Sequence, residues 1–486
     1  MKYQAPPGVF DIIPEDEREP WRSTHLWQYV EKVIHETAQQ YGYQEIRTPI
    51  FEKSELFLRC VGDSSDIVSK EMYLFQDKGN RQMALRPEGT ASALRAFLEN
   101  GMPARGQVHK LYYIAPMFRY DRPQAGRYRQ HHQFGVEAIG VPTPAQDVEV
   151  IDLLYTVYTR LGLSNLKVRI NSIGNHESRD RFREALRDYL RPHLSELSTD
   201  SQRRFESNPL RILDSKDPKD QEAIKNGPSI LDFLDEASKN HFDTVLRLLK
   251  ILEIPYFLDP LLVRGLDYYN STVFEITSAA LGAQNSIGGG GRYDGLIKLL
   301  GGPDLPAFGF GSGIERIIQT MIGQQISLPY PEGPMVYLIP LGEEAQKRGF
   351  SLLHELRNAG ISSTMELGNR KLGKAMNHAN QIRASYAIVF GDDELEQNEV
   401  TLKLMETGEE NRVPISSLAA ILRIEMKAIP YMELMQEMSQ PFEHPVESQF
   451  FLRKIKSSVE DTKQMIDNTQ QTFKQLIDKL EDNSKE

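Results

Sequence analysis

A cationic loop between two strand-like stretches holds the most chemically informative residues of this chain. An apolar, aromatic stretch ends in Arg119, and a loop rich in Pro, Gly and Arg follows over residues 122–129. The next stretch, 132–137, alternates so that Gln133 and Glu137 share one face of a strand. An antiparallel hairpin of this kind would offer a cation, an amide and a carboxylate to one small ligand, and its tip would bind phosphates. A solvated charged hairpin is the alternative for this stretch taken alone.

A second candidate is the segment 262–270, which gathers polar and aromatic side chains around a glycine. It contains Arg264, Asp267, Tyr268 and Tyr269 in a region of otherwise buried character. Polar groups there reduce stability unless each finds a partner. They could form an internal Arg–Asp pair with packed tyrosines, or they could face a ligand.

Glycine-rich segments would let the backbone approach a ligand closely. Residues 288–291 are four successive glycines, which fit either such an approach or a tight turn. Residues 307–318 predict a glycine-rich strand that turns into a helix. Arg316 lies in the first turns of that helix, where the dipole favours an anion. Taken alone, Arg316 fits a surface cation better than a ligand contact.

Two glycine patterns imitate nucleotide-binding motifs without fulfilling them. Residues 309–313 are too closely spaced for a dinucleotide fingerprint, and no acidic residue ends a following strand. Residues 368–375 resemble a phosphate-binding loop, but Ala375 replaces the hydroxyl side chain that would hold magnesium. The bases of this segment would instead bind the phosphates of a polynucleotide. They are Arg370, Lys371 and Lys374.

The elements that must position these residues are predicted from hydrophobic periodicity and from turn residues. We expect helices over 20–42 and 147–162, strands over 43–51 and 166–170, and a strand that runs into a helix start over 83–90. Between about 172 and 255 the sequence becomes polar and helical, which indicates an inserted domain. A proline-rich linker, 329–334, precedes the last third of the chain.

The part of the chain after this linker divides in two. Strand and helix patterns alternate over 335–424, which predicts an α/β domain with a largely parallel sheet. Apolar residues then recur at three- and four-residue spacings over about the last 60 residues, which predicts a long helix with one apolar stripe.

Bulk composition limits the class of protein. The 486 residues carry a net charge of −11, which argues against indiscriminate coating of nucleic acid but permits local basic patches. We find no signal peptide and no stretch approaching the ~18 apolar residues of a membrane span. Cys60 is the only cysteine, so no disulfide framework and no thiolate metal site is expected. These features favour a cytoplasmic protein without a membrane partner.

Several of these segments together resemble the ordered motifs of class II histidyl-tRNA synthetases. They are residues 86–90, the hairpin 117–137, and residues 262–269, 288–295 and 313–316. The resemblance covers residues 1 to about 424. It implies a multidomain α/β protein whose catalytic domain, 1–328, has an antiparallel sheet core flanked by helices and carries the helical insertion. An α/β anticodon-binding domain would follow over 335–424, with 425–486 as a helical C-terminal extension. An oligomer contact, an additional tRNA clamp and simple packing remain open as roles for this extension.

The resemblance implies that the enzyme joins L-histidine to ATP, which gives histidyl-adenylate and pyrophosphate, and then transfers the histidyl group to tRNA(His). Among the residues that match the family motifs, Arg119 would bind the α-phosphate and Arg316 would lie near the γ-phosphate. Arg264 would take the α-phosphate side, where related enzymes place a metal ion. Magnesium is implied through ATP, and no protein-bound metal is expected. Residues 43–51 resemble the motif that builds the family's homodimer interface.

The implied histidine site rests on the chemistry of its ligand. Neutral imidazole has one donor and one acceptor nitrogen, and Glu137 and Tyr269 would face them. Glu88 and Thr90 would hold the α-ammonium group. The implied histidine-binding residues are Glu88, Gly89, Thr90, Gln133, Glu137, Tyr268 and Tyr269. The implied tRNA contacts are Arg122, Gln124 and Arg127 at the acceptor end, and Arg370, Lys371 and Lys374 in the last domain.

Two alternatives of another class share the same core. One is a non-catalytic paralogue that senses histidine, such as the regulatory subunit of ATP phosphoribosyltransferase, and the other is an RNA-binding module. The first kind typically lacks the α/β domain and a complete 262–269 segment, and this chain has both. The sequence departs from the family mainly at Asp121, where glutamate is more frequent, and in its C-terminal extension.

Overall fold

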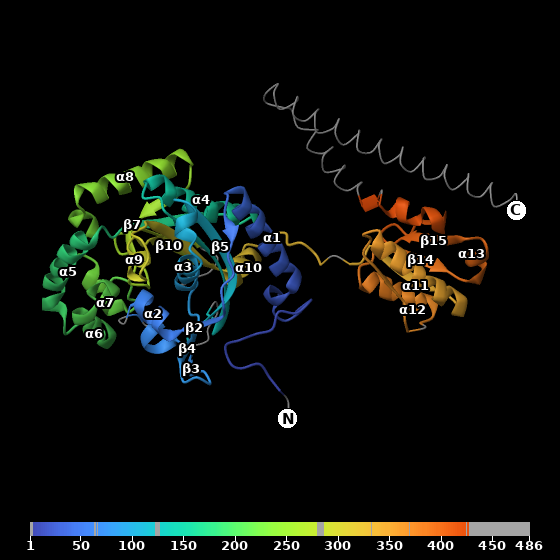
Figure 1. The fold of residues 1–486 in the computed structure, drawn as a ribbon, viewed down its shortest axis with the longest axis horizontal. Helices are drawn as coiled ribbons and strands as arrows, with labels where there is room; N and C mark the ends of the chain where they lie inside the picture. Colours follow the sequence, from blue (N-terminus) through green and yellow to red (C-terminus); the bar gives the residue numbers. More distant parts are fainter. Residues whose placement is uncertain are drawn as a thin grey trace, which may run out of the picture. The chain divides into compact units, whose positions relative to one another are not determined.

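The computed structural model describes residues 3–62, 65, 67–121, 127–278, 286–331, 333–368, 370–423 and 425–426. Arg122 and Gln124 therefore lie outside the described residues, as does nearly all of the extension predicted over 425–486. The chain forms two compact units, Met1–Tyr330 and Pro331–Glu486 (Figure 1). None of the described helices combines the length and apolar character needed to cross a bilayer.

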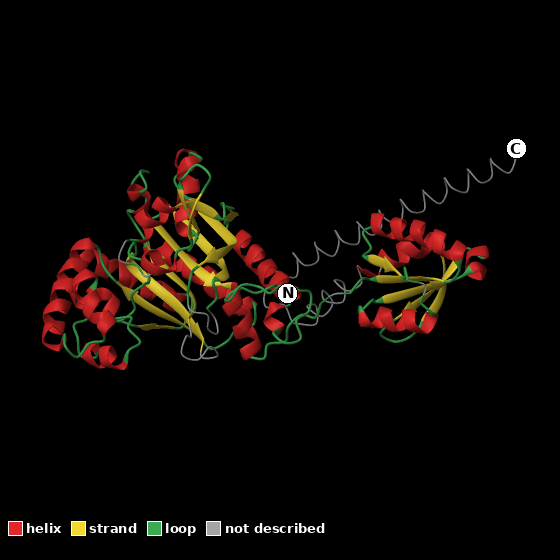
Figure 2. Cartoon of the chain, turned by 90° about the horizontal axis from the view of Figure 1, so that it is seen from below, coloured by secondary structure: helices red, strands yellow, loops and turns green. Residues whose placement is uncertain are grey.

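An eight-stranded sheet forms the centre of the first unit (Figure 2). Its strand order is β1-β5-β6-β11-β10-β9-β7-β8, and its neighbours are antiparallel except for the outer pairs β1–β5 and β7–β8. The predicted antiparallel core and the hairpin are thereby confirmed. The strands are β1 (Gln44–Glu45), β5 (His109–Phe118), β6 (Gln130–Ile139), β7 (Leu166–Ser172), β8 (Tyr256–Leu258), β9 (Asn270–Ser278), β10 (Ser286–Arg292) and β11 (Ala307–Gly313).

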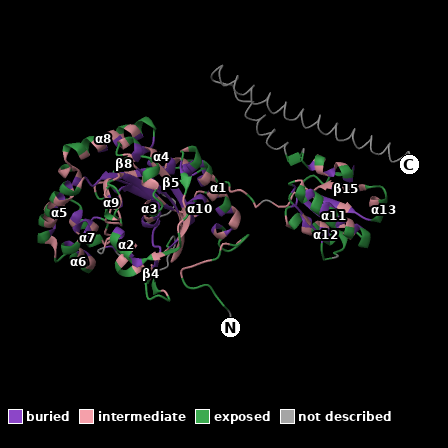
Figure 3. Cartoon of the chain, in the orientation of Figure 1, coloured by how far each residue is buried: buried purple, intermediate pink, exposed green. Residues whose placement is uncertain are grey.

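Helices cover this sheet, and the apolar residues between the layers are buried (Figure 3). Phe134 and Val136 of β6 pack into one cluster with the apolar faces of the longer helices, as the alternation predicted. The helices outside the insertion are α1 (Thr24–Gln40), α2 (Ser54–Val61), α3 (Thr90–Glu99), α4 (Pro144–Arg160), α9 (Leu296–Leu299) and α10 (Ile314–Gly323). Short helical turns are η1 (Pro20–Arg22), η2 (Ile67–Glu71) and η3 (Met102–Arg105).

The single strand expected over 43–51 is wrong. Residues 44–45 pair with β5, whereas β2 (Phe51–Lys53) joins a separate small sheet with β4 (Gln82–Leu85) and β3 (Leu74–Gln76). Between them, the Nη1 group of Arg86 donates hydrogen bonds to the carbonyl oxygens of Thr48 and Pro49. Pro49 also has no N–H to give to a ladder, so the chain leaves the large sheet at this point.

A helical region lies between β7 and β8, in the range where the sequence predicts an insertion. It contains α5 (His176–Leu190), η4 (Arg191–His193), α6 (Thr199–Ser207), η5 (Pro209–Ile212), α7 (Pro218–Ile224), η6 (Ile230–Phe233) and α8 (Glu236–Ile251). Each of its four described α-helices is capped by the side chain of the preceding residue; at α5, for example, Asn175 accepts a hydrogen bond from the amide of Ser178. Helix α8 packs against α4, so the region is joined to the core of the first unit.

The second unit is a five-stranded sheet with helices on both faces. The order β13-β12-β14-β15-β16 is parallel between its first three strands and antiparallel between the others. The expected largely parallel sheet is thus only half right, because a turn at Gly408, where φ is 77°, folds the last two strands into a hairpin. The elements are β12 (Val336–Pro340), α11 (Glu343–Asn358), β13 (Ser363–Met365), α12 (Leu372–Gln381), β14 (Tyr386–Phe390), α13 (Asp392–Glu396), β15 (Glu399–Leu404) and β16 (Glu410–Pro414).

Candidate active site

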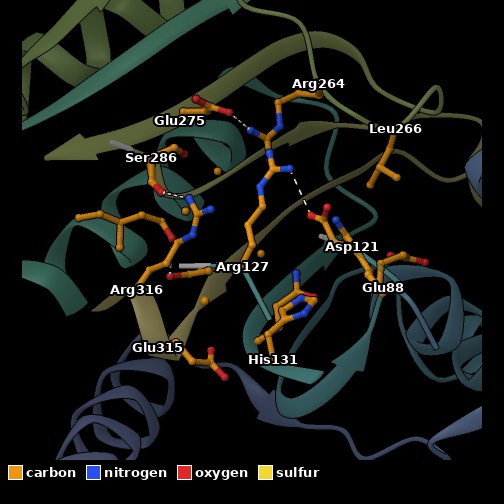
Figure 4. A pocket seen from close by; sticks show the side chains of 18 of the residues that line it. Glu88, Asp121, Arg127, His131, Arg264, Leu266, Glu275, Ser286, Glu315 and Arg316 are labelled. Carbon is orange, nitrogen blue, oxygen red and sulfur yellow. Dashed lines mark hydrogen bonds and ion pairs between the residues drawn. The ribbon is translucent and has the colours of Figure 1, made fainter. Parts of the chain in front are cut away.

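A cavity of about 740 Å³ lies in the first unit and brings the separate sequence motifs together (Figure 4). Side chains from β6, from the end of the hairpin, from the segment 262–269 and from the start of α10 all line it. The predicted site residues that line it are Glu88, Thr90, Arg119, Arg127, Gln133, Arg264, Tyr268, Tyr269 and Arg316. Five stretches far apart in the chain therefore meet around one space.

Part of the cavity wall is bare main chain. Gly289 of β10 pairs with Gly311 of β11, and both line the cavity. A Cβ atom on Gly311 would lie 1.7 Å from Nε2 of Gln133, and one on Gly289 would lie 2.5 Å from the carbonyl oxygen of Phe274. The glycine run 288–291 is thus part of strand β10, where neighbouring atoms lie too close to leave room for side chains. The tight-turn interpretation is wrong.

Arg119, Arg264 and Arg316 are three of the five arginines among the described residues that line the cavity, and each is anchored by its guanidinium group. Arg119 donates from Nε to the carbonyl oxygen of Pro87 at 2.8 Å, and Arg316 donates from Nη1 to that of Ser286 at 2.6 Å. Arg264 forms an ion pair with Glu275, seen at the top of Figure 4. Because a guanidinium carries five N–H donors, the anchors of Arg119 and Arg264 leave further donors for a ligand.

Arg264 has a second feature that bears on its position. Its guanidinium carbon lies 5.9 Å from the centroid of the Tyr269 ring, and its buried Nε has no hydrogen-bond partner among the described residues. The ion-pair alternative for residues 262–270 is also resolved, because Arg264 pairs with Glu275 of β9 and Asp267 accepts a hydrogen bond from Asn208. Arg264 and Asp267 therefore do not form the internal pair considered from sequence.

Glu88 lies at the beginning of α3 with its carboxylate over the helix N-terminus. Its two oxygens accept hydrogen bonds from the amides of Thr90, at 2.7 Å, and Ala91, at 2.8 Å. Burial raises the pKa of Glu88, and these amides and the charge of Arg119 oppose that shift. Gly89 has no room for a side chain, since a Cβ there would lie 2.3 Å from the ring of Tyr113.

Glu137 lies beneath the cavity and has no exposed surface. Tyr113 donates to Oε1 at 3.2 Å, and Tyr293 donates to Oε2. Burial raises the pKa of Glu137 to about 8, although the bond from Tyr293 lowers it. Its hydrogen-bond partners are thus Tyr113 and Tyr293, while Tyr269 lines the cavity beside Tyr268 with ring centroids 4.6 Å apart.

Other cavity residues were missed from the sequence. Glu275, which also forms an ion pair with Arg169, stood out only as one carboxylate in an apolar strand, and that signal could have identified it. His131 lines the cavity near Arg119, and burial together with that charge lowers its pKa to about 3. Its imidazole is therefore neutral at physiological pH. Tyr293 falls within the glycine-rich segment 288–295, but nothing local in the sequence indicates that it would reach Glu137.

The predicted tRNA contacts fall in both units. Arg127 lines the cavity and pairs with Asp121 at 3.2 Å. In the second unit, Arg370, Lys371 and Lys374 are exposed around the start of α12. Arg370 donates at 2.7 Å to Glu366.

Glu366 is itself buried and accepts two more hydrogen bonds. They come from the hydroxyl of Tyr337 and from the amide of Gly368, both at 2.6 Å. Burial alone would raise the pKa of Glu366, but the bonds from Tyr337, Arg370 and Gly368 lower it to about 2. The segment before α12 is thus fixed to the sheet by one carboxylate.

Among the described residues, no group of three or more His, Cys, Asp or Glu side chains is arranged to hold a metal ion. The described residues that line the cavity instead include six lysine or arginine side chains, six carboxylates and the amide of Gln133. Such a set suits a ligand that carries phosphates together with an amino group.

The chain matches two family models in succession. Residues 16–317 match the model described as histidyl-tRNA synthetase, and residues 335–425 match that of an anticodon binding domain. The first match includes every cavity residue named above. The second covers the sheet and helices of the second unit.

Individual relatives agree with these models. A histidine–tRNA ligase of Protochlamydia amoebophila is 59% identical over 423 residues, which are 87% of this chain and 100% of that relative. That of Bacillus subtilis is 46% identical over 430 residues, which are 88% of this chain and 100% of the relative. The crystal structure of apo histidyl-tRNA synthetase from S. aureus has a TM-score of 0.73 at 38% identity, and the match covers 87% of this chain and 100% of that one.

Proposed function

This chain belongs to the histidyl-tRNA synthetase family, and we propose that the cavity of its first unit is where L-histidine and ATP form histidyl-adenylate. The convergence of Arg119, Arg264 and Arg316 on one cavity carries the proposal. A carboxylate oxygen of histidine attacks the α-phosphorus of ATP. A new O–P bond forms, the bond to the bridging oxygen breaks, and pyrophosphate leaves with the bonding electrons.

The arginines stabilise the charge of this transition state. Arg119 and Arg264 bind the α-phosphate, where negative charge develops, and Arg316 binds the pyrophosphate end. Fixed cations accelerate such a step because they need no reorganisation when the charge moves. Magnesium enters as part of Mg–ATP and is bound mainly by the phosphates.

The neighbouring polar groups select histidine. Glu88 and the hydroxyl of Thr90 receive the α-ammonium group, with Gly89 giving the backbone its close approach to Tyr113. Gln133 supports the proposal because its buried Oε1 has no hydrogen-bond partner among the described residues and lies ready for a donor. Tyr268 and Tyr269 line the imidazole site, and Glu137 beneath them accepts the imidazole N–H after a shift of Tyr113 or Tyr293 exposes its carboxylate, which is fully buried in this structure.

The histidyl group then passes to tRNA(His). The terminal ribose hydroxyl of the tRNA attacks the carbonyl carbon of histidyl-adenylate, and AMP leaves. Arg127, together with Arg122 and Gln124, binds the acceptor end. Residues 335–424 form the anticodon-binding domain, in which Arg370, Lys371 and Lys374 contact phosphates. The reaction takes place in the cytoplasm, where translation uses its product.

The active form is a homodimer that pairs through the small sheet β2-β4-β3. This sheet and the turn before it expose a group of large apolar side chains, as expected for a covered surface. They are Ile50 (46% exposed), Phe51 (51%), Leu74 (51%) and Phe75 (40%). Phe51 and Phe75 lie edge to face with ring centroids 6.0 Å apart.

Histidine-dependent exchange of pyrophosphate into ATP tests the proposed function directly. Purified protein should catalyse this exchange with histidine and not without it, and Arg264→Ala should abolish it. A folded protein without exchange that binds histidine would point to the histidine-sensing paralogue. One that binds RNA but not histidine would point to the RNA-binding module.

A further inference from the structure

The helical insertion reaches the segment 262–269 through two arginines. Arg179 of α5 donates from Nη1 to the carbonyl oxygen of Tyr269 at 2.7 Å. Arg211 of η5 hydrogen-bonds through Nη2 to the carbonyl oxygen of Gly265. Charge-assisted bonds of this type are among the stronger polar contacts in proteins. Both therefore fix the backbone of the segment to the insertion.

A third side chain of the insertion holds the same segment between these two points. Asn208, which precedes η5, donates from Nδ2 to Oδ1 of Asp267 at 3.1 Å. The other oxygen of Asp267 faces Gly62, where a Cβ would lie only 2.6 Å from it. The Asp267 carboxylate is thus confined between the insertion and the end of α2.

The anchored positions lie among the residues that line the cavity. The insertion holds residues 265, 267 and 269. Arg264, Leu266 and Tyr268 line the cavity between them, and Tyr269 lines it as well. The backbone turns at residues 265–268, so the three bonds fix the bend that carries these side chains.

Apolar contacts join the same two segments. Residues of η5 and its neighbourhood share one buried cluster with the start of the segment 262–269. The buried residues involved are Leu210, Ile212 and Leu213 on the insertion side, and Leu262, Val263 and Tyr269 on the other. The insertion also forms part of the cavity wall itself, through Asp214 and Lys216.

We infer that Arg179, Asn208 and Arg211 are positioning residues for histidine activation, which hold the segment 264–269 so that Arg264 meets the α-phosphate. This inference rests on the proposed function. Glu275 forms an ion pair with the guanidinium group of Arg264, but the buried Nε of Arg264 has no hydrogen-bond partner among the described residues. The position of this side chain therefore depends also on the backbone that carries it. The placement of the helical insertion thereby determines the geometry of the chemical step.

The first experiment compares Arg211→Ala and Arg179→Ala with Arg203→Ala in pyrophosphate exchange. Arg203 is a matched control, because it is an exposed arginine of α6 in the same insertion and pairs with Asp200. Rates are divided by the active fraction, which is measured as the burst of histidyl-adenylate. We expect kcat to fall about 10- to 100-fold in the two test variants, as for displaced binding groups, and to stay unchanged in the control.

A double variant separates positioning from general damage. If Arg211 acts through Arg264, then Arg211→Ala combined with Arg264→Lys, which should keep measurable exchange, should lose no more activity than Arg264→Lys alone. Multiplying losses would overturn the inference. An inactive wild type would instead refute the proposed function, whereas an active wild type with unimpaired Arg179 and Arg211 variants would refute only this inference.

The Asn208–Asp267 contact provides a test that does not depend on the arginine variants folding. Asn208→Asp places two carboxylates together and should lower exchange. Adding Asp267→Asn restores a donor and an acceptor with their positions exchanged, and should recover most of the activity. Failure of this recovery in a folded double variant would contradict a positioning role for Asn208.

Discussion

The hydroxyl group of Tyr293 donates a hydrogen bond to the carboxylate of Glu137 across the intervening strand β11. The two residues lie 156 positions apart in the chain. Gly309 allows this contact, since a Cβ there would lie 2.5 Å from Oε2 of Glu137 and 3.1 Å from the Tyr293 hydroxyl. This contact beneath the proposed histidine site thus depends on residue 309 being glycine, which has no side chain.

The raised pKa of Glu137 predicts a specific pH dependence of stability. Because the folded pKa is about 8 and the ordinary value is about 4.3, the folded protein retains a proton in this window that the unfolded chain has released. The free energy of unfolding therefore falls as pH rises from about 4.3 to about 8. Glu137→Gln cannot ionise and should lack this loss.

Thermal unfolding of wild type and Glu137→Gln between pH 5 and 8.5 measures the effect. The difference in melting temperature, variant minus wild type, should increase with pH over that range. Parallel pH profiles would contradict the buried protonated carboxyl. Tyr293→Phe is the companion variant, because removing this donor should raise the pKa of Glu137 further and extend the loss of stability to higher pH than in wild type.

Arg264→Lys should fail to support activation although it keeps the charge. A lysine has one compact ammonium group in place of a planar fork, so it cannot hold Glu275 and a phosphate together. We expect kcat for pyrophosphate exchange to fall on the order of 10²- to 10³-fold, as for loss of a transition-state donor. Arg160→Lys in α4, where Arg160 donates to Thr37, should leave the rate unchanged.

Local patterns predicted the hairpin, most helices and the alternating order of the second unit. The hairpin could be predicted because β5 and β6 are neighbours in sequence and the alternation of their side chains is strong. The break at Pro49 could not be predicted, since it depends on Arg86 binding the carbonyl groups of Thr48 and Pro49 from another strand.

In the active site, too, local motifs could be predicted and tertiary contacts could not. Arg119, Arg264 and Arg316 were found because each lies in a recognisable motif. The partners of Glu137 escaped prediction because they are set by the register of distant strands. Contacts between the insertion and residues 265–269 are also tertiary, and no periodicity indicates them.

Glu366 provides a test of the second unit. Glu366→Gln should weaken its bond to Arg370 and release the segment before α12, which raises the KM for tRNA about 3- to 10-fold, as for a loss of up to about 1.4 kcal/mol. Pyrophosphate exchange should not change, because it needs no tRNA. Lys347→Ala on α11, an exposed lysine paired with Glu344, is the control. An equal effect on exchange would contradict a role confined to tRNA.

The same carboxylate predicts acid sensitivity. Its folded pKa of about 2 lies below the ordinary value of about 4.3, so Glu366 stabilises the fold above pH 4.3. That contribution is lost as pH falls from about 4.3 to about 2. Acid unfolding of the second unit should be followed with a probe other than tryptophan fluorescence. Glu366→Gln should lose less stability over this pH range than wild type.

Phe51→Glu should weaken the proposed homodimer. A charge within the exposed apolar group of the small sheet would remain desolvated in the interface, which costs several kcal/mol unless it is paired. Sedimentation equilibrium should show a monomer at concentrations where wild type is dimeric. Ile251→Glu is the control, because Ile251 is 73% exposed but lies on α8, and it should not alter the assembly.

The bare backbone of β10 and β11 constrains how this cavity can change over evolutionary time. Every amino acid supplies the same main-chain atoms. Point mutations can therefore obstruct this bare part of the cavity wall, but they cannot give it new chemical groups without obstructing it. A Cβ on Gly290 would lie 1.9 Å from the carbonyl oxygen of Gly309, which leaves little tolerance even for alanine. A lineage that acquired a different substrate would therefore have to change the other side chains that line the cavity while it kept the glycines of β10 and β11.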